Sequence, residues 1–113
     1  MEIKTEDYGV SYSPEEQVIC CWGTLRLPGT ADYAPIAALL DQVVAAQPPQ
    51  VTLDLQNLKF LNTSGINVLS KFVIKLRQQE TIQLTIKGSD DIPWQGRSLK
   101  NLQRLMPSLR LMF

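Results

Sequence analysis

The alternation of strand-like and helix-like runs along the whole chain constrains the fold more than any other feature. Short runs rich in β-branched residues, such as 51–55 (VTLDL) and 81–87 (TIQLTIK), alternate with longer runs whose apolar residues recur at helical spacing. The order is β-β-α-β-α-β-α, with a final strand or apolar tail at 109–113. Strands that alternate with helices form a parallel or mixed sheet covered by helices. We therefore predict an α/β domain with a mixed sheet and three or four helices.

The first half of the chain predicts an N-terminal hairpin followed by a helix. Residues 8–27 indicate two strands joined at Ser13 to Glu16, where turn-forming residues cluster. Pro35 fits only the first turn of the next helix, which must end before Pro48. The apolar stripe of that helix consists of Ile36, Leu39, Leu40, Val43 and Val44.

Two further helices follow from the same kind of spacing. The stripe of the first consists of Ile66, Leu69, Phe72, Val73 and Leu76. Leu99, Leu102, Leu105 and Met106 mark a last helix, which Pro107 terminates.

Length and composition fit one globular domain spanning residues 1–113. Apolar residues make up 44% of the chain and charged residues 19%. Eleven basic residues balance eleven acidic ones, so no net field favours nucleic acid. We find no apolar run long enough for a bilayer and no basic, apolar leader, and therefore expect a cytoplasmic protein. The adjacent Cys20 and Cys21 should point to opposite faces of a strand, where they cannot easily pair, and we expect both to be buried thiols.

The sequence gives little support to an enzyme. It contains no histidine, the commonest general base, and Ser64 does not lie in a G-x-S-x-G motif. It also lacks the glycine-rich motifs that cradle phosphates. Two cysteines without histidine are too few ligands for a zinc site. We therefore expect a non-enzyme that needs no cofactor and no metal.

Polar side chains are concentrated at one strand-to-helix junction, residues 60–65 (FLNTSG). Asn62 or Thr63 can cap the following helix, and Gly65 allows close approach of the backbone. Capping does not account for Ser64, which should lie exposed at the carboxyl end of a strand, where α/β sheets place their working surface. A phosphate on Ser64 would face the positive end of the helix dipole.

The stretch 51–78 (VTLDLQNLKFLNTSGINVLSKFVIKLRQ) resembles the signature of the STAS domain of sulfate transporters and anti-sigma factor antagonists. In that family a strand leads through Phe-(apolar)-Asp-Ser-Ser-Gly into an amphipathic helix. The upstream run 23–40 (GTLRLPGTADYAPIAALL) is similar to the family's Gly-x-Leu-Asp loop and first helix, and the order of elements agrees along nearly the whole chain. The resemblance implies a STAS-like domain.

The resemblance also implies a regulatory role and a site. It points to an anti-sigma factor antagonist that binds an anti-sigma factor, a GHKL-type serine kinase, and is dephosphorylated by a serine phosphatase. Ser64 matches the phosphorylated serine, with Thr63 as the second candidate. Asn62 and Arg26 stand where the family commonly has Asp. The predicted partner-binding residues are Arg26, Pro28, Gly29, Thr30, Lys59, Phe60, Asn62, Thr63, Ser64, Gly65, Asn67, Ser70 and Lys71.

Other functions stay open at this stage. A STAS-type subunit could dock on a membrane transport ATPase and control it without being phosphorylated, and Asn62 in place of Asp favours that alternative. A small-ligand or nucleotide-binding sensor domain is a third possibility. The sequence does not determine the oligomeric state.

Overall fold

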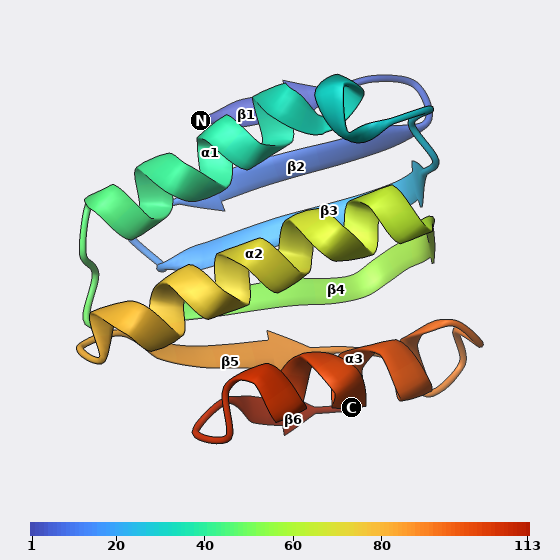
Figure 1. The fold of residues 1–113 in the computed structure, drawn as a ribbon. Coiled ribbons are helices and arrows are strands. Elements are labelled where there is room, and N and C mark those ends of the chain that lie inside the picture. Colours follow the sequence, from blue (N-terminus) through green and yellow to red (C-terminus); the bar gives the residue numbers. More distant parts are fainter.

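A single six-stranded sheet organises the molecule in the computed structural model, which describes all residues from Met1 to Phe113. The strands lie side by side in their order along the chain (Figure 1). The first three are antiparallel, and the last four run parallel to one another. They are β1 (Glu2–Lys4), β2 (Tyr8–Ser13), β3 (Val18–Leu25), β4 (Gln50–Leu61), β5 (Gln83–Lys87) and β6 (Arg110–Met112).

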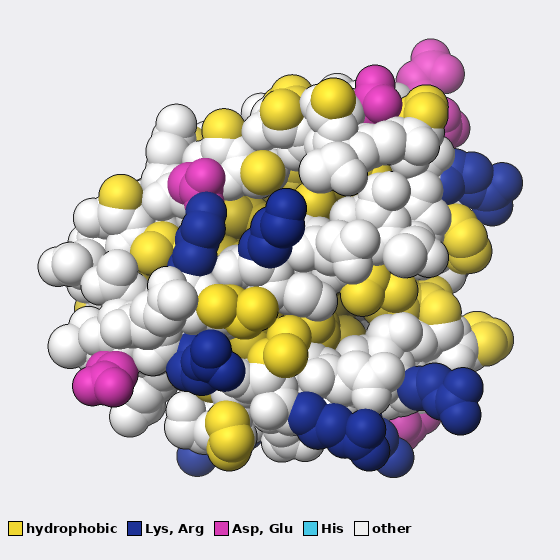
Figure 2. All heavy atoms as spheres, in the orientation of Figure 1, with side chains coloured by type: hydrophobic (Ala, Val, Ile, Leu, Met, Phe, Trp, Pro, Cys, Tyr) yellow, Lys and Arg dark blue, Asp and Glu magenta, His cyan; other side chains and the backbone are white.

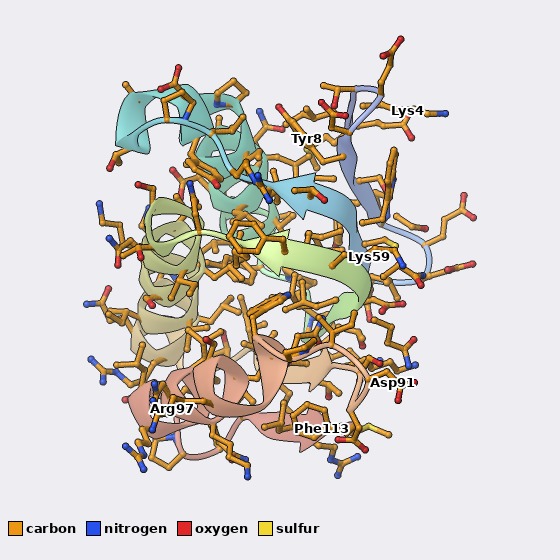
Figure 3. All side chains as sticks on the ribbon, turned by 90° about the vertical axis from the view of Figure 1, so that its right-hand side faces the viewer. Lys4, Tyr8, Lys59, Asp91, Arg97 and Phe113 are labelled. Carbon is orange, nitrogen blue, oxygen red and sulfur yellow. The ribbon has the colours of Figure 1, made fainter.

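Three α-helices cover one face of this sheet and leave the other face open (Figures 1 and 3). Each parallel connection moves one strand further in the same direction, and right-handed crossovers that all advance the same way place their helices on the same side. The helices are α1 (Ala34–Ala45), α2 (Thr63–Gln79) and α3 (Gln95–Leu105), and a 3₁₀ turn, η1 (Thr30–Tyr33), precedes α1. None of these helices has the length and apolar character needed to cross a membrane.

The core lies between the sheet and the helices. Along β4, Val51, Leu53 and Leu55 are almost fully buried, whereas Thr52 and Asp54 between them face the open side. The same alternation points Cys20 and Cys21 to opposite faces, as predicted, but only Cys21 is a buried thiol, because Cys20 lies partly exposed on the open face. Burial, with smaller effects from Cys20 and Asp54, raises the pKa of Cys21 to about 12.

The second half of β4 is irregular, and this irregularity changes the direction of the strand before it leads into α2. The register between β3 and β4 shifts twice, between Cys20 and Trp22 and between Gly23 and Thr24. Gly23 has φ of +87°, and a Cβ there would lie 2.1 Å from a backbone oxygen of Asp7, so only glycine fits. β-bulges of this kind bend a strand and redirect the residues that follow.

Side chains at the start of α3 and just before it supply hydrogen bonds that β5 cannot give to this part of β4. β5 ends opposite Asp54, so the carbonyl groups beyond it have no β5 neighbour. Gln95 is fully buried, and its Nε2 donates to the oxygens of Leu55 (2.7 Å) and Leu58 (3.1 Å). Trp94 Nε1 also donates to Leu58, at 3.0 Å. These bonds hold the bulged half of β4 in place.

The predicted α/β class, the N-terminal hairpin and the mixed sheet are confirmed. One boundary was wrong and one strand was missed. β4 continues to Leu61 instead of ending near Leu55, because Gln56, Asn57 and Lys59 occupy the bulged, solvent-facing part of the strand. The chain also begins with β1, an additional edge strand that the hairpin prediction did not include.

Candidate functional site

The N-terminus of α2 forms the candidate site, and Asn62 caps it. Asn62 has extended backbone angles, and its Oδ1 accepts a hydrogen bond from the N–H of Gly65 at 3.1 Å. The helix starts at Thr63, and its first turn contains no acidic residue. Of the two predicted caps, Asn62 is therefore the one used.

Asn62 also joins the helix to the loop that follows β3. Its Nδ2 donates to the oxygen of Leu27 at 2.9 Å, and its Oδ1 accepts from the phenol of Tyr33 at 2.6 Å. The Asn62 backbone N–H donates to Leu25, at 3.1 Å. One side chain thus uses both its donor and its acceptor to fix two segments far apart in the sequence. A carboxylate at this position could not donate to Leu27.

Gly65 is required by the packing beneath the helix. A Cβ at this residue would lie 2.3 Å from Leu61 Cδ1 and 2.9 Å from the phenol oxygen of Tyr33. Tyr33 is buried, and burial raises the pKa of its phenol. Gly65 therefore allows a close approach, as predicted. The approaching group is the buried Tyr33, which the sequence did not indicate.

Ser64 and Thr63 occupy the first turn of α2 with their hydroxyl groups free. Thr63 is exposed and Ser64 is half-buried, and neither hydroxyl makes a hydrogen bond within the molecule. The first-turn N–H groups of a helix lack intrahelical acceptors and carry partial positive charge. The site therefore presents two hydroxyl groups beside a positive helix end.

Arg26 and Phe60 form a pair at the same end of the sheet. The Arg26 guanidinium lies 4.8 Å from the centroid of the Phe60 ring, and Phe60 is 38% exposed. Leu25 and Leu27, the neighbours of Arg26 in the chain, both bond to Asn62. The pair is therefore tied directly to the start of α2.

A shallow groove between α1 and α2 continues the site along the helix face. It has a volume of about 80 Å³, and Thr30 and Lys71 contribute to its walls. Lys75 lines it too and forms an ion pair with Asp41 of α1. Figure 2 shows Lys and Arg side chains over α2 and α3 on this face of the molecule.

The structure brings together most, but not all, of the predicted partner-binding residues. Thr63, Asn67 and Lys71 follow one another at helical spacing on the outer side of α2. Ser70 lies beside them, but its hydroxyl donates to the oxygen of Ile66 at 2.9 Å and is already used within the helix. Lys59 extends from the sheet face opposite the helices (Figure 3). It lies apart from this surface.

The β3–α1 loop supplies the remaining predicted residues. Pro28 and Thr30 are exposed, and Gly29 is partly exposed with its N–H bonded to Asp32 Oδ2 at 3.1 Å. Because Asn62 holds Leu27, this loop lies next to the N-terminus of α2. Tyr33 and the Leu27 carbonyl were missed, since only the folded chain brings them to Asn62.

The sequence matches no protein-family model and no curated protein sequence. A chain in the crystal structure of the diguanylate cyclase SiaD in complex with its activator SiaC from Pseudomonas aeruginosa superposes with a TM-score of 0.75. The two chains are 13% identical, and the match covers 99% of this chain and 96% of the other.

Two other solved structures have the same arrangement of elements. An anti-sigma factor antagonist from Mycobacterium paratuberculosis matches with a TM-score of 0.69 and 20% identity, over 92% of this chain and 86% of the other. The phosphorylated form of the Bacillus cell fate determinant SpoIIAA matches with a TM-score of 0.60 and 11% identity, over 94% and 91%. This chain therefore has the STAS fold that these proteins share.

Proposed function

We propose that this protein is a protein-binding module of a partner-switching pathway, an anti-sigma factor antagonist controlled by reversible phosphorylation at Ser64. The observation that carries the proposal is the free hydroxyl of Ser64 in the first turn of α2, a turn that Asn62 already caps. Because the cap is supplied by another residue, Ser64 is not needed for local structure and remains available for modification.

A phosphate on Ser64 would be compatible with the fold and would change the affinity for a partner. It would add about −1.5 to −2 charges at the positive end of α2. No acid lies in the first turn to repel it, and Asn62 is neutral where a carboxylate would be repulsive. The new charge would therefore change the docking surface without unfolding the domain.

The proposed docking surface consists of the exposed side of α2 and the adjacent β3–α1 loop. Thr63, Asn67 and Lys71 form its helical part, and Pro28 and Thr30 form its loop part. The proposed partners are an anti-sigma factor of the GHKL serine kinase type and a serine phosphatase, all in the cytoplasm. The unphosphorylated protein would bind the kinase, and the phosphorylated protein would be released.

Mass spectrometry of the protein purified from its native host tests this proposal. Trypsin cleaves after Lys59 and Lys71, so residues 60–71 form one peptide that contains Thr63, Ser64 and Ser70. Fragmentation of this peptide should place the phosphate on Ser64. Incubation with the cognate kinase and ATP should label the wild type and Thr63→Ala, but not Ser64→Ala. Label that persists in Ser64→Ala would overturn the assignment.

A second candidate is the activation of an enzyme by direct binding. It is supported by the match over nearly the full length to the complex that contains SiaC, which is described as the activator of a diguanylate cyclase. In this case the same face of α2 would bind the enzyme. Affinity purification with wild type and Ser64→Asp separates the candidates. A GHKL-type kinase captured by wild type supports the first, and a diguanylate cyclase supports the second.

A further inference from the structure

Side-chain charge is divided unevenly along the chain. Residues 1–16 carry a net charge of −4, from five acids and Lys4, and residues 94–113 carry +4, from four bases and no acid. Residues 17–93 contain six bases and six acids and are neutral. The balanced total therefore consists of a neutral middle between two oppositely charged segments.

The fold places these two segments on opposite edges of the sheet. β1 is the edge strand on one side, and β6 is the edge strand on the other, where α3 packs against it. In Figure 1, β1 lies at the top and β6 lies with α3 at the bottom, and Figure 3 shows the same separation between Lys4 and Arg97. The acidic edge consists of Glu2 in β1, Glu6 and Asp7 between β1 and β2, and Glu15 and Glu16 between β2 and β3. The basic edge consists of Arg97, Lys100 and Arg104 of α3 and Arg110 of β6.

The charged groups of both edges are free to meet a second molecule. All nine side chains are exposed, and none forms an ion pair within the protein. The single ion pair joins Lys75 of α2 to Asp41 of α1, between the two edges. Each edge therefore presents charge of predominantly one sign that the fold itself does not neutralise.

The backbone and the apolar side chains of the two edges are also unpartnered. β1 pairs only with β2, and β6 pairs only with β5, so the outer N–H and C=O groups of both strands lack a strand partner. β1 and β6 run in the same direction, because each is antiparallel to β2. Exposed large apolar side chains lie at both edges, Met1 beside β1 and Met112 and Phe113 at β6. A second copy in the same orientation could therefore continue the sheet.

We propose that this protein associates head to tail with further copies of itself, the acidic edge of one copy against the basic edge of the next. Two acidic edges repel each other, as do two basic edges, so a symmetric dimer through like edges is disfavoured. Because the two contact surfaces lie on opposite sides of the molecule, each added copy leaves one of each free and the assembly can grow.

This association leaves the surface around Ser64 accessible. Neither edge contains any of the proposed partner-binding residues. All helices lie on one face of the sheet, so a continued sheet would carry the α2 surface of every copy on that same face. Several partner-binding surfaces on one assembly would raise the avidity for a multivalent partner.

Sedimentation velocity of the full chain over a series of protein concentrations tests the association. Charges act over about 30 Å at about 0.01 M salt and over about 3 Å at about 1 M. At the lower ionic strength we expect species larger than a dimer that grow with concentration, and at the higher one an association at least tenfold weaker. A monomer at every concentration up to millimolar, or a closed dimer that salt does not affect, would overturn the proposal.

Charge reversal of one edge at a time tests the head-to-tail arrangement. Glu2→Lys with Glu6→Lys cancels the net charge of the acidic edge, and Lys100→Glu with Arg110→Glu cancels that of the basic edge. All four residues are exposed, so both double variants should fold normally and associate at least tenfold more weakly than the wild type. Their equimolar mixture should form dimers that do not grow, because each variant keeps one intact edge. A mixture that stays monomeric or grows beyond the dimer would contradict the arrangement.

A matched control separates edge pairing from the effect of net charge. Lys59→Glu with Lys71→Glu makes the same change in net charge as the reversal of the basic edge, at exposed residues of β4 and α2 in the neutral part of the chain. This variant should associate within a few-fold of the wild type. Equal losses in this control and in Lys100→Glu with Arg110→Glu would overturn the proposal.

Discussion

The phenol of Tyr33 donates a hydrogen bond to Oδ1 of Asn62 at 2.6 Å, although 29 residues separate them in the sequence. The same amide donates through Nδ2 to Leu27, so Asn62 acts as donor and acceptor at once. This double role is a physical reason for an amide at position 62, where the family that the sequence resembles commonly has a carboxylate. In this protein the residue connects the β3–α1 loop to α2.

Replacement of Asn62 by Asp should destabilise the protein. The carboxylate would keep the bonds from Gly65 and Tyr33 but would face the Leu27 oxygen without a hydrogen. An unsatisfied group costs about 1–3 kcal/mol, and the negative charge at the helix N-terminus offsets about 0.3–1 kcal/mol of that. Urea unfolding should rank the free energy of unfolding as wild type above Asn62→Asp above Asn62→Ala. An Asn62→Asp variant as stable as the wild type would contradict this role.

Gly65→Ala should lower stability even though alanine favours helices. The new methyl group would meet Leu61 and the Tyr33 hydroxyl, and overpacking of this kind costs about 1–3 kcal/mol. Gly96→Ala is the control, because no atom lies within 4 Å of a Cβ at that helical position. That change should be neutral or stabilise by up to about 1 kcal/mol. Thermal unfolding should show a lower melting temperature for Gly65→Ala and an unchanged or higher melting temperature for Gly96→Ala.

Gln95→Met should be among the most destabilising single changes in the chain. It preserves much of the volume but leaves the Leu55 oxygen and the N–H of Ser89 without partners. At about 1–3 kcal/mol for each unsatisfied group, the loss should be roughly 2–6 kcal/mol. Gln103→Met, on the same helix, removes a single bond to Leu109 in a half-buried position and should cost only about 1 kcal/mol. Similar losses in the two variants would show that Gln95 does not hold the bulged strand.

Alkaline pH should lower the free energy of unfolding, because the Cys21 thiol ionises more readily in the unfolded chain than in the folded protein. Its pKa is raised to about 12, mainly by burial, from an ordinary value of 9.0. The folded state keeps the thiol neutral while the unfolded chain ionises it. This contribution to the free energy of unfolding is therefore complete below about pH 9 and is lost as the pH rises towards 12. The stability difference between wild type and Cys21→Ala should shrink from about pH 8 to about pH 10.5 in urea titrations. A difference that stays constant over this range would contradict the raised pKa.

The fold could be predicted from the sequence because its strands and helices have different apolar periods. The alternation in VTLDL also indicates that only one face of the sheet is covered, since Thr52 and Asp54 between the buried residues face the open side. The far half of β4 could not be predicted in the same way. Its bulges break the period of two, and Gln95, about 40 residues later, supplies the missing hydrogen bonds.

In the candidate site, too, the local features could be predicted from the sequence and the long-range contacts could not. The cap at Asn62, the helix start and the close packing at Gly65 are local properties, and the hexapeptide indicated all of them. The contacts from Tyr33 and Leu27 are long-range, and no local pattern indicates them. The separation of Lys59 from the helix surface was missed for the same reason, because it depends on the register of the bulged strand.

The affinity for the cognate partner, compared between wild type, Ser64→Ala and Ser64→Asp, tests the proposed switch most directly. The partner to use is a GHKL-type kinase captured from the host with the wild-type protein, and Thr63→Asp is the matched control for charge at the first turn. We expect Ser64→Ala to bind like the wild type and Ser64→Asp to bind at least tenfold more weakly, with an unchanged melting temperature. Equal affinity of Ser64→Asp and wild type would contradict the account.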